Sequence, residues 1–178
     1  MAKKASRRLV IDTSVARAAG TEESTHPTGR NCREFLKAVL RVCHRLVMTA
    51  DLAEEWAKHQ SSFTRKWRVQ MFARKKQVSP EPDPDASLDD AIGRLDVAHA
   101  ERERMRKDCL LIEAALASDK SVVSLEESVR ELFSAASRSV RALRQIVWVN
   151  PDRKQDQPLQ WLEQGAHSEP KRMLGRQA

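Results

Sequence analysis

Four short apolar runs, separated by longer segments of helical periodicity, constrain the fold of this chain more than any other feature. The runs lie at residues 9–11, 45–49, 121–126 and 145–150. Each is rich in branched aliphatic side chains, as is typical of buried strands. The segment from Asn31 to Cys43 instead places its apolar residues on one face of a helix. Strands that alternate with helices predict an α/β protein with three layers, in which helices cover both faces of a central parallel sheet of four to five strands.

Three further helical regions are predicted, over residues 51 to about 77, about 88–118 and about 127–144. The first begins with Asp51 and Glu54 at the spacing of a capping box, and the serines at 61–62 predict a break within it. We expect a second break before Lys107. Residues 79–90 hold three prolines and five acids, and this composition predicts an exposed acidic linker.

The charge of the chain indicates a class of partner. Its 32 Lys and Arg residues against 25 Asp and Glu give a net charge of +7 and an isoelectric point near 9.7. Such a surface attracts polyanions, nucleic acid foremost, because binding releases their counterions. The three cysteines stand at unrelated spacings, and no apolar stretch has the length of a signal peptide or transmembrane helix. We therefore expect a cytoplasmic protein without a membrane partner.

Acidic residues stand where a parallel sheet usually presents its binding site. They are Asp12 at the end of the first run, Glu54 and Glu55 one helical turn after the second, Asp108 at the start of an apolar helix, and Glu126 and Glu127 at the end of the third run. Because the carboxyl ends of parallel strands meet along one edge, these carboxylates can converge there. A divalent cation relieves their repulsion, and Mg²⁺ or Mn²⁺ prefers oxygen ligands.

Two of these acids have a structural alternative. Asp12 and Asp108 each precede a predicted helix and can stabilise its first turn as a cap. The residues three, four and seven positions after Asp108 are apolar, so its side chain heads an apolar stripe rather than a solvated face. This pattern favours a site at Asp108 over a cap.

Four motifs carry a family resemblance. In chain order, "VIDTSV", "MTADLAEEW", "KDCLLIEAALASDKSVVSLEE" and "IVWVNP" resemble the PIN domain, a nuclease fold found in VapC-type toxins and RNA-processing enzymes. The resemblance implies a PIN-like domain over residues 1–150, with a helical and acidic-linker insertion at about 58–105. Residues 151–178 are predicted to be a polar C-terminal tail, which we expect to be loosely ordered or to dock on the surface through Trp161 and Leu162.

The same resemblance implies roles for individual residues. The implied catalytic acids are Asp12, Glu55, Asp108 and Glu126, with Glu54 as the register alternative to Glu55. The implied ligands of Mg²⁺ or Mn²⁺ are Asp12, Asp108 and Glu126, and Ser14 matches a hydroxyl residue near metal-bound water or substrate phosphate. Glu126 is a departure, since the family usually has Asp at this position after Thr or Ser and one further residue. The departure leaves three outcomes open: a preference for Mn²⁺, slow cleavage, or an inactive site.

Other polar residues have simpler explanations. Cys32, Cys43 and His44 could be taken for zinc ligands, but the cysteines share a predicted apolar helix, no C-x-x-C pair exists, and core packing is favoured. Cys109 is interpreted as a small buried side chain. His59 follows Glu55 by four residues, which fits either two ligands on one helical face or a solvated face.

A basic stretch at residues 61–77 is the strongest binding signal outside the acids. Its cations Arg65, Arg68, Lys75 and Lys76 are predicted to contact substrate phosphates, whereas Trp67, Met71 and Phe72 are interpreted as mainly structural, with base stacking as the alternative. The acidic linker is a candidate cover for this basic surface when substrate is absent.

These features together predict a PIN-like endoribonuclease that uses Mg²⁺ or Mn²⁺ to hydrolyse single-stranded or structured RNA. A protein that kept the fold for RNA binding or scaffolding but lost catalysis is one alternative. The toxin of a toxin–antitoxin pair, which would bind an antitoxin protein, is another, and the family resembled often forms homodimers. A phospho-acceptor signalling domain also uses a strand-end aspartate, but no lysine or paired N-terminal acids support it here.

Overall fold

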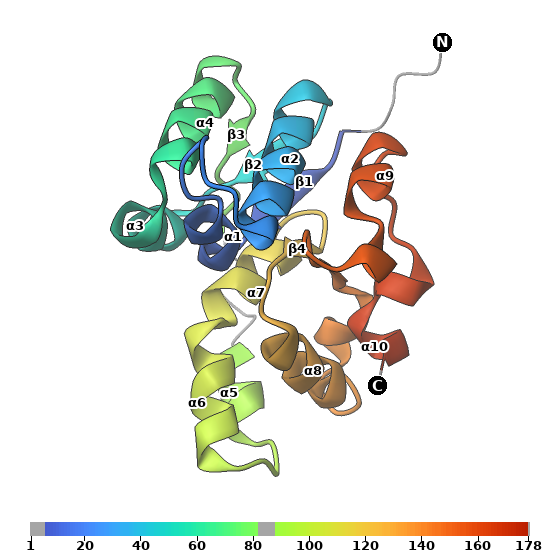
Figure 1. Ribbon diagram of the computed structural model, residues 1–178. Coiled ribbons are helices and arrows are strands. Elements are labelled where there is room, and N and C mark those ends of the chain that lie inside the picture. Colours follow the sequence, from blue (N-terminus) through green and yellow to red (C-terminus); the bar gives the residue numbers. More distant parts are fainter. Residues whose placement is uncertain (1–5, 82–87, 178) are drawn as a thin grey trace.

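A five-stranded parallel sheet forms the centre of the molecule in a computed structural model, which describes residues 6–81 and 88–177 (Figure 1). The strands are β1 (Arg8–Ile11), β2 (Arg45–Val47), β3 (Gln77–Val78), β4 (Ser121–Val123) and β5 (Val147–Val149). Their order is β3-β2-β1-β4-β5, and every neighbouring pair is parallel. Helices flank the sheet, so the predicted three-layer α/β/α architecture is confirmed.

The strand order creates a switch point beside β1. The chain begins at this central strand, runs outward through β2 and β3, and returns to build β4 and β5 on the other side. In open parallel sheets the crevice at such a point, outside the carboxyl ends of the strands, is the usual place for a ligand. The register pairs Ile11 with Val123, so the residues that follow β1 and β4 emerge side by side.

The helices follow the predicted regions with several differences in their bounds. The first five are α1 (Thr13–Ala18), α2 (Pro27–Arg41), α3 (Ala50–His59), α4 (Ser62–Ala73) and α5 (Leu88–Gly93). The others are α6 (His99–Lys107), α7 (Cys109–Leu116), α8 (Glu127–Ala136), α9 (Pro158–Glu163) and α10 (Leu174–Gln177), with short 3₁₀ turns at Arg141–Gln145, Lys154–Asp156 and Pro170–Arg172.

The region from residue 51 to 77 divides into two helices and an edge strand. Thr49, rather than Asp51, occupies the cap of α3, where its hydroxyl accepts a bond from the Leu52 amide (3.3 Å). The predicted break at the serines is confirmed, since the Ser61 hydroxyl caps α4. The prediction of helix up to residue 77 was wrong, because Gln77–Val78 pairs with β2. A two-residue strand carries almost no periodic signal of its own.

Two other predicted helical regions are also interrupted. The region 88–118 contains α5, α6 and α7 and is therefore broken twice. The break that was predicted before Lys107 falls at Asp108, just after Lys107. Residues 82–87 of the predicted acidic linker lie outside the described residues, while its last three residues belong to α5. Helix α8 ends at Ala136 instead of continuing to residue 144. There the Ser137 hydroxyl bonds to the carbonyl of Ser134 (2.6 Å), a local bond that competes with helix.

The C-terminal segment packs into the core through Trp161 and Leu162, the two residues predicted to dock, instead of docking only on the surface. Trp161, Leu162 and Leu174 are buried, and the Trp161 indole donates to the carbonyl of His167 (2.9 Å). The amide of Leu174 donates to the carbonyl of Ile146, just before β5 (2.9 Å). The tail is therefore part of the folded unit. Among the described residues, no helix is long and apolar enough to cross a membrane.

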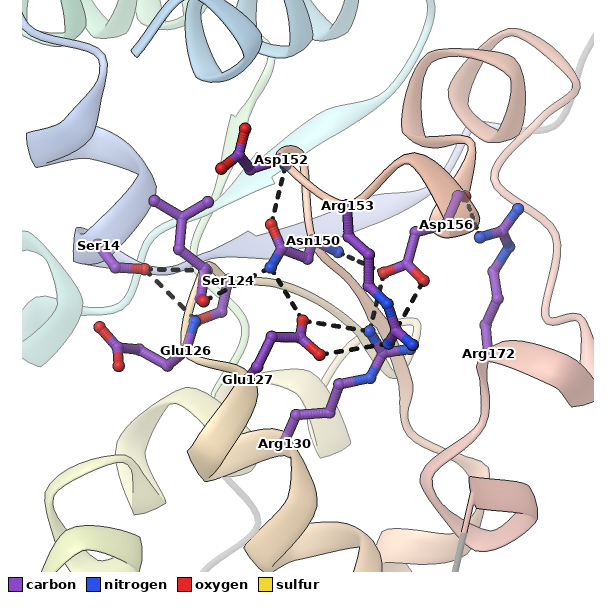
Figure 2. Close-up of polar contacts among 11 residues, drawn as sticks. Ser14, Ser124, Glu126, Glu127, Arg130, Asn150, Asp152, Arg153, Asp156 and Arg172 are labelled. Atoms are coloured by element: carbon purple, nitrogen blue, oxygen red, sulfur yellow. Dashed lines mark hydrogen bonds and ion pairs between the residues drawn. The ribbon is translucent and has the colours of Figure 1, made fainter. Parts of the chain in front are cut away.

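A buried ion pair fastens this segment to α8. The carboxylate of Asp156 lies 2.8 Å from the Arg130 guanidinium, and the two side chains are only 7% and 4% exposed. The same carboxylate accepts a bond from the backbone amide of Asn150 (2.8 Å), and Arg172 donates to the Asp156 carbonyl (Figure 2). Removing one member of such a pair leaves an uncompensated buried charge.

We predict that Asp156→Ala lowers the free energy of unfolding by about 3 kcal/mol, because buried Arg130 then loses a partner at 2.8 Å while the contact with Glu127 at 3.4 Å still compensates part of its charge. Urea unfolding followed by circular dichroism measures the change. The matched control is Asp152→Ala, since Asp152 is exposed and its carboxylate bonds only to the neutral side chains of Thr28 and Asn31 among the described residues. Equal losses in the two variants would contradict the role given to the buried pair.

Candidate active site

Asp12 is held at the switch point by two hydroxyl groups from different elements. It follows β1 at the cap position of α1, yet its side chain makes no capping bond among the described residues. Its carboxylate instead accepts hydrogen bonds from the hydroxyls of Ser14 and of Ser124, the latter at 2.8 Å. The alternative of a simple helix cap does not account for this arrangement. Two donors orient the carboxylate toward the carboxyl edge of the sheet.

The turn after β4 is built around the same hydroxyls. The Ser124 hydroxyl accepts from the amide of Glu126 (3.1 Å), and the Ser14 hydroxyl accepts from the amide of Leu125 (3.2 Å). These bonds fix the backbone that carries Glu126, whose exposed carboxylate lies on the same side as Ser14 (Figure 2). Ser14 is therefore a positioning residue for two acids as well as a wall of the site.

Asp108 reaches the site from the junction of α6 and α7. Its side chain makes no cap bond with the described residues, so capping does not explain it. Burial raises the pKa of the Asp108 carboxyl to about 7, and the negative charges of Asp12 and Glu126 add to the rise against the opposing charges of Arg104 and Lys107. Mutual repulsion of this kind requires the acids to lie close together.

One cavity of about 330 Å³ brings these side chains together. Its lining consists of Asp12, Thr13, Ser14, Arg17, His59, Arg104, Lys107, Asp108, Glu126 and Val129. Three carboxylates thus share the cavity with three permanent cations. Sequence reasoning missed Arg17 and Arg104, although each stands about one helical turn from a predicted acid, and that spacing is the signal for them.

Glu55 lies apart from the other predicted acids. It is not among the residues that line the cavity, and its carboxylate lies 3.5 Å from Lys58 and 3.9 Å from His59. Glu54 likewise pairs with Lys58 (3.0 Å). His59, one turn after Glu55, does line the cavity. The structure therefore brings Asp12, Asp108 and Glu126 together and connects Glu55 to them only through His59.

The donor set suits a hard cation by its chemistry. Carboxylates and hydroxyls offer oxygen ligands only, as Mg²⁺ and Mn²⁺ prefer, and a cation would relieve the repulsion that raises the pKa of Asp108. Within the described residues, no three His, Cys, Asp or Glu side chains already form a group that could hold a metal ion. Asp12, Asp108 and Glu126 are the residues that would hold one.

The zinc alternative finds no support among the cysteines and His44. His44 is buried, and its Nδ1 accepts from the amide of Arg7 (3.1 Å) while its Nε2 lies 2.9 Å from the carbonyl of Leu162. Both ring nitrogens are thus engaged by backbone. Cys32 is buried as predicted, but Cys43 is exposed, since α2 ends before it at Arg41. Cys109 is buried, as interpreted from its position.

The basic stretch separates into structural and exposed residues. Lys76 donates to the carbonyls of Val39 (2.6 Å) and Leu40 (2.8 Å) and to that of Val42, so it satisfies the end of α2. This use places its ammonium group against backbone rather than toward a substrate. Arg65 and Lys75 are exposed and Arg68 is partly buried, on or directly after α4.

A second polar cluster stands behind the turn of Glu126. The carboxylate of Glu127 accepts from Asn150 (2.9 Å) and Arg153 (3.2 Å), and it lies 3.4 Å from Arg130 (Figure 2). Glu127 therefore joins the buried pair of α8 and the C-terminal segment instead of the cavity. The sequence identified Glu127 as an acid but not its partners. Asn150 and Arg153 lie more than twenty residues further along the chain, and Arg130 lies one helical turn after Glu127.

The chain matches no family model, no curated protein and no solved structure in comparisons with known proteins.

We predict that Asp108→Asn becomes increasingly more stable than the parent protein as the pH rises from about 4 to 7. The ordinary pKa of this carboxyl is 3.8 and the folded value about 7, so between them the folded protein keeps a proton that the unfolded chain loses. The stability of the parent protein therefore falls across this window by up to about 4 kcal/mol, and an amide shows no such loss. Above pH 7 the difference levels off. Urea unfolding in EDTA at several pH values measures it.

The control is Glu163→Gln, which changes an exposed acid on α9 to its amide. Its neighbour Leu162 contacts His44 at the amino edge of the sheet, whereas the cavity lies at the carboxyl edge. Its difference from the parent protein should not follow the window of Asp108. A pH-independent difference for Asp108→Asn would contradict the crowding of acids in the cavity.

Proposed function

We propose that the chain is a metal-dependent endoribonuclease with a PIN-like site. The observation that carries the proposal is the meeting of Asp12, Asp108 and Glu126, from three separate segments, in one cavity at the switch point of the sheet. A carboxyl whose pKa is raised by burial and by two like charges is typical of a functional site, because such crowding gives a purely structural site no stability. The PIN-domain resemblance supports the same reading of these acids.

The proposal assigns the metal site to these three carboxylates. When bound there, Mg²⁺ or Mn²⁺ lowers the pKa of a coordinated water and neutralises charge on the scissile phosphate. Asp12 presents a carboxylate whose orientation is fixed by Ser14 and Ser124. Asp108 and Glu126 supply the remaining negative charge, and their repulsion makes the site favourable for a cation.

The cations of the cavity complete the chemistry. Arg104 and Lys107 lie on the last turns of α6, just before Asp108, and Arg17 lies on α1. Their charges suit a phosphodiester, which is repelled by carboxylates alone. In the hydrolysis, a water oxygen bonds to phosphorus and the bond from phosphorus to the leaving ribose oxygen breaks. The attacking water loses a proton, and the leaving oxygen takes up a proton, so the step balances as the addition of one water.

RNA is the proposed substrate because the net charge of +7 and the basic stretch on α4 suit a long polyanion. Single-stranded and structured RNA both fit this argument. A homodimer, an antitoxin partner and a cytoplasmic location stay predictions from the sequence.

A second candidate is an RNA-binding protein that kept the fold without catalysis. Glu126 stands where the resembled family has Asp, and within the described residues no three ligands already share one metal position. This candidate requires RNA binding that is equal with and without EDTA, and no cleavage. The two candidates therefore differ in a single assay.

We predict that the purified protein cleaves end-labelled RNA with Mn²⁺ or Mg²⁺ and not with EDTA. Asp12→Asn and Asp108→Asn should each lower the cleavage rate at least about 100-fold, because each removes a charge that would bind the metal. Glu163→Gln, purified in the same way, should cleave as the parent protein does, and the loss of cleavage in the two aspartate variants excludes a contaminating nuclease. Cleavage that survives both aspartate substitutions would sink the assignment. RNA binding without any cleavage would favour the second candidate.

We further predict that Mn²⁺ at about 100 times its Kd raises the unfolding temperature at pH 8 by about 5–10 °C, since binding to the folded state alone stabilises it by about 2.7 kcal/mol. Asp12→Asn should lose most of this rise, because its carboxylate is the one fixed by two hydroxyls. Differential scanning fluorimetry measures the shift without any need for substrate. An equal rise in Asp12→Asn would place the metal elsewhere.

A further inference from the structure

Helix α4 presents an outer face that the proposed cleavage site does not use. The α4 outer face consists of Arg65, Arg68, Val69 and Phe72 on the helix, together with Lys75, which lies two residues after the end of α4. Phe72 is 71% exposed and Val69 is 65% exposed, which makes them the most exposed large apolar side chains of the described residues. The sequence interpretation of Phe72 as a structural residue was wrong. An aromatic side chain left in water has no packing reason to be there.

The inner face of α4 already satisfies the core without Phe72. Trp67 and Met71 are buried, and the Trp67 indole donates to the carbonyl of Leu36 (2.6 Å). The ring of Trp67 also stacks on Trp56, with ring centroids 6.2 Å apart. The core interpretation of Trp67 and Met71 is confirmed, and it accounts for this face completely. Phe72 points the other way.

The segment that carries Phe72 holds charge of one sign. Residues 61–78 contain six cations and no acid, and the cations are Arg65, Lys66, Arg68, Arg74, Lys75 and Lys76. None of the six forms an ion pair with another described residue, and Lys76 is used to cap α2. Partial burial lowers the pKa of the Arg68 guanidinium, and no carboxylate offsets the effect. The face therefore lacks an anionic partner within the described structure.

We propose that the α4 outer face is a binding site for single-stranded RNA, in which Phe72 stacks on a base while Arg65, Arg68 and Lys75 contact the backbone phosphates. Exposed aromatic rings set among cations form the platforms on which proteins bind single strands without reading their sequence. A protein partner is less well suited, because two apolar side chains interleaved with cations do not form a continuous apolar patch. The choice of RNA over another single-stranded polyanion rests on the proposed function.

The position of α4 connects this site to the acidic cavity. At its start, the amide of Ser61 donates to the carbonyl of Ala16 (3.1 Å) and the amide of Phe63 to that of Gly20 (3.2 Å). The beginning of α4 is thus fixed to α1, which carries Ser14 and Arg17 of the cavity. Phe72 lies ten residues into the helix, about 15 Å along its axis. A strand stacked on Phe72 can follow the basic face of α4 toward the acids.

We test the site by the binding of a fluorescent twelve-nucleotide oligouridylate in EDTA, measured by anisotropy. Phe72→Ala should weaken binding about 5-fold to 100-fold, the loss of one base stack, and Phe72→Trp should restore it. Leu159→Ala is the control, since Leu159 is also an exposed large apolar residue, 41% exposed, and lies on α9, away from α4 (Figure 1). The affinity of Leu159→Ala for the oligouridylate should equal that of the parent protein. Arg68→Gln should reduce the salt dependence of binding, which Phe72→Ala should leave intact.

An oligonucleotide with abasic residues separates stacking from charge. The parent protein and Phe72→Ala should bind it equally, because only the phosphates remain to be contacted. Equal affinity of the two proteins for the oligouridylate would overturn the proposal. So would a Phe72→Ala variant that turns a dimer into a monomer in analytical ultracentrifugation without losing RNA affinity, since the face would then be a surface for self-association.

The experiment also separates this site from the proposed activity. EDTA removes any need for a metal, so the affinity for the oligouridylate reports on the α4 outer face independently of cleavage. A Phe72-dependent affinity in a protein that never cleaves RNA would support the α4 site and reject the nuclease. Cleavage by a protein whose RNA affinity does not depend on Phe72 would support the nuclease and reject the α4 site.

Discussion

The parallel pairing of β1 with β4 is the constraint on which the rest of the site depends. Because Ile11 is in register with Val123, the next residues of the two strands, Asp12 and Ser124, emerge as neighbours although they lie far apart in sequence. The Ser124 hydroxyl can then reach the Asp12 carboxylate at 2.8 Å. A shift of one residue in this register would turn the side chains of the strand to the opposite face and separate the pair. The sheet thus creates the site before any charge is considered.

Charge balance in the cavity explains why these acids can stay together. The buried environment and the two neighbouring carboxylates oppose ionisation of Asp108, so its pKa rises to about 7. Arg104 and Lys107 act in the opposite sense, and without them the cost of three carboxylates in one cavity would be larger. These cations do not pair with Asp108 closely enough to cancel its repulsion from Asp12. The carboxylates of the cavity therefore still repel one another, and a bound cation can relieve this repulsion.

The sequence predicted the parts of this molecule that have local signals. Short β-branched runs located four strands, and acids at the ends of such runs located Asp12 and Glu126, because strand ends in a parallel sheet share an edge. Asp108 was located by the apolar helix that it precedes. The edge strand β3 has only two residues and exists because β2 offers it a partner. The pair of Arg130 and Asp156 was also out of reach, because it forms only when the C-terminal segment docks. Such features depend on tertiary contacts, which periodicity does not encode.

The two faces of helix α4 also depend on tertiary contacts, and this dependence bears on the function proposed for its outer face. A stripe of Trp67, Met71 and Phe72 is compatible with a core face, yet a helix turns 100° per residue, so adjacent positions such as Met71 and Phe72 cannot both face one wall squarely. The core takes Trp67 and Met71, with Trp67 donating to the backbone of α2. Phe72 is thereby directed outward among cations. A single helix therefore forms one wall of the fold and one exposed basic surface, and substitutions on its outer face can change binding without disturbing the residues that hold the acids in place.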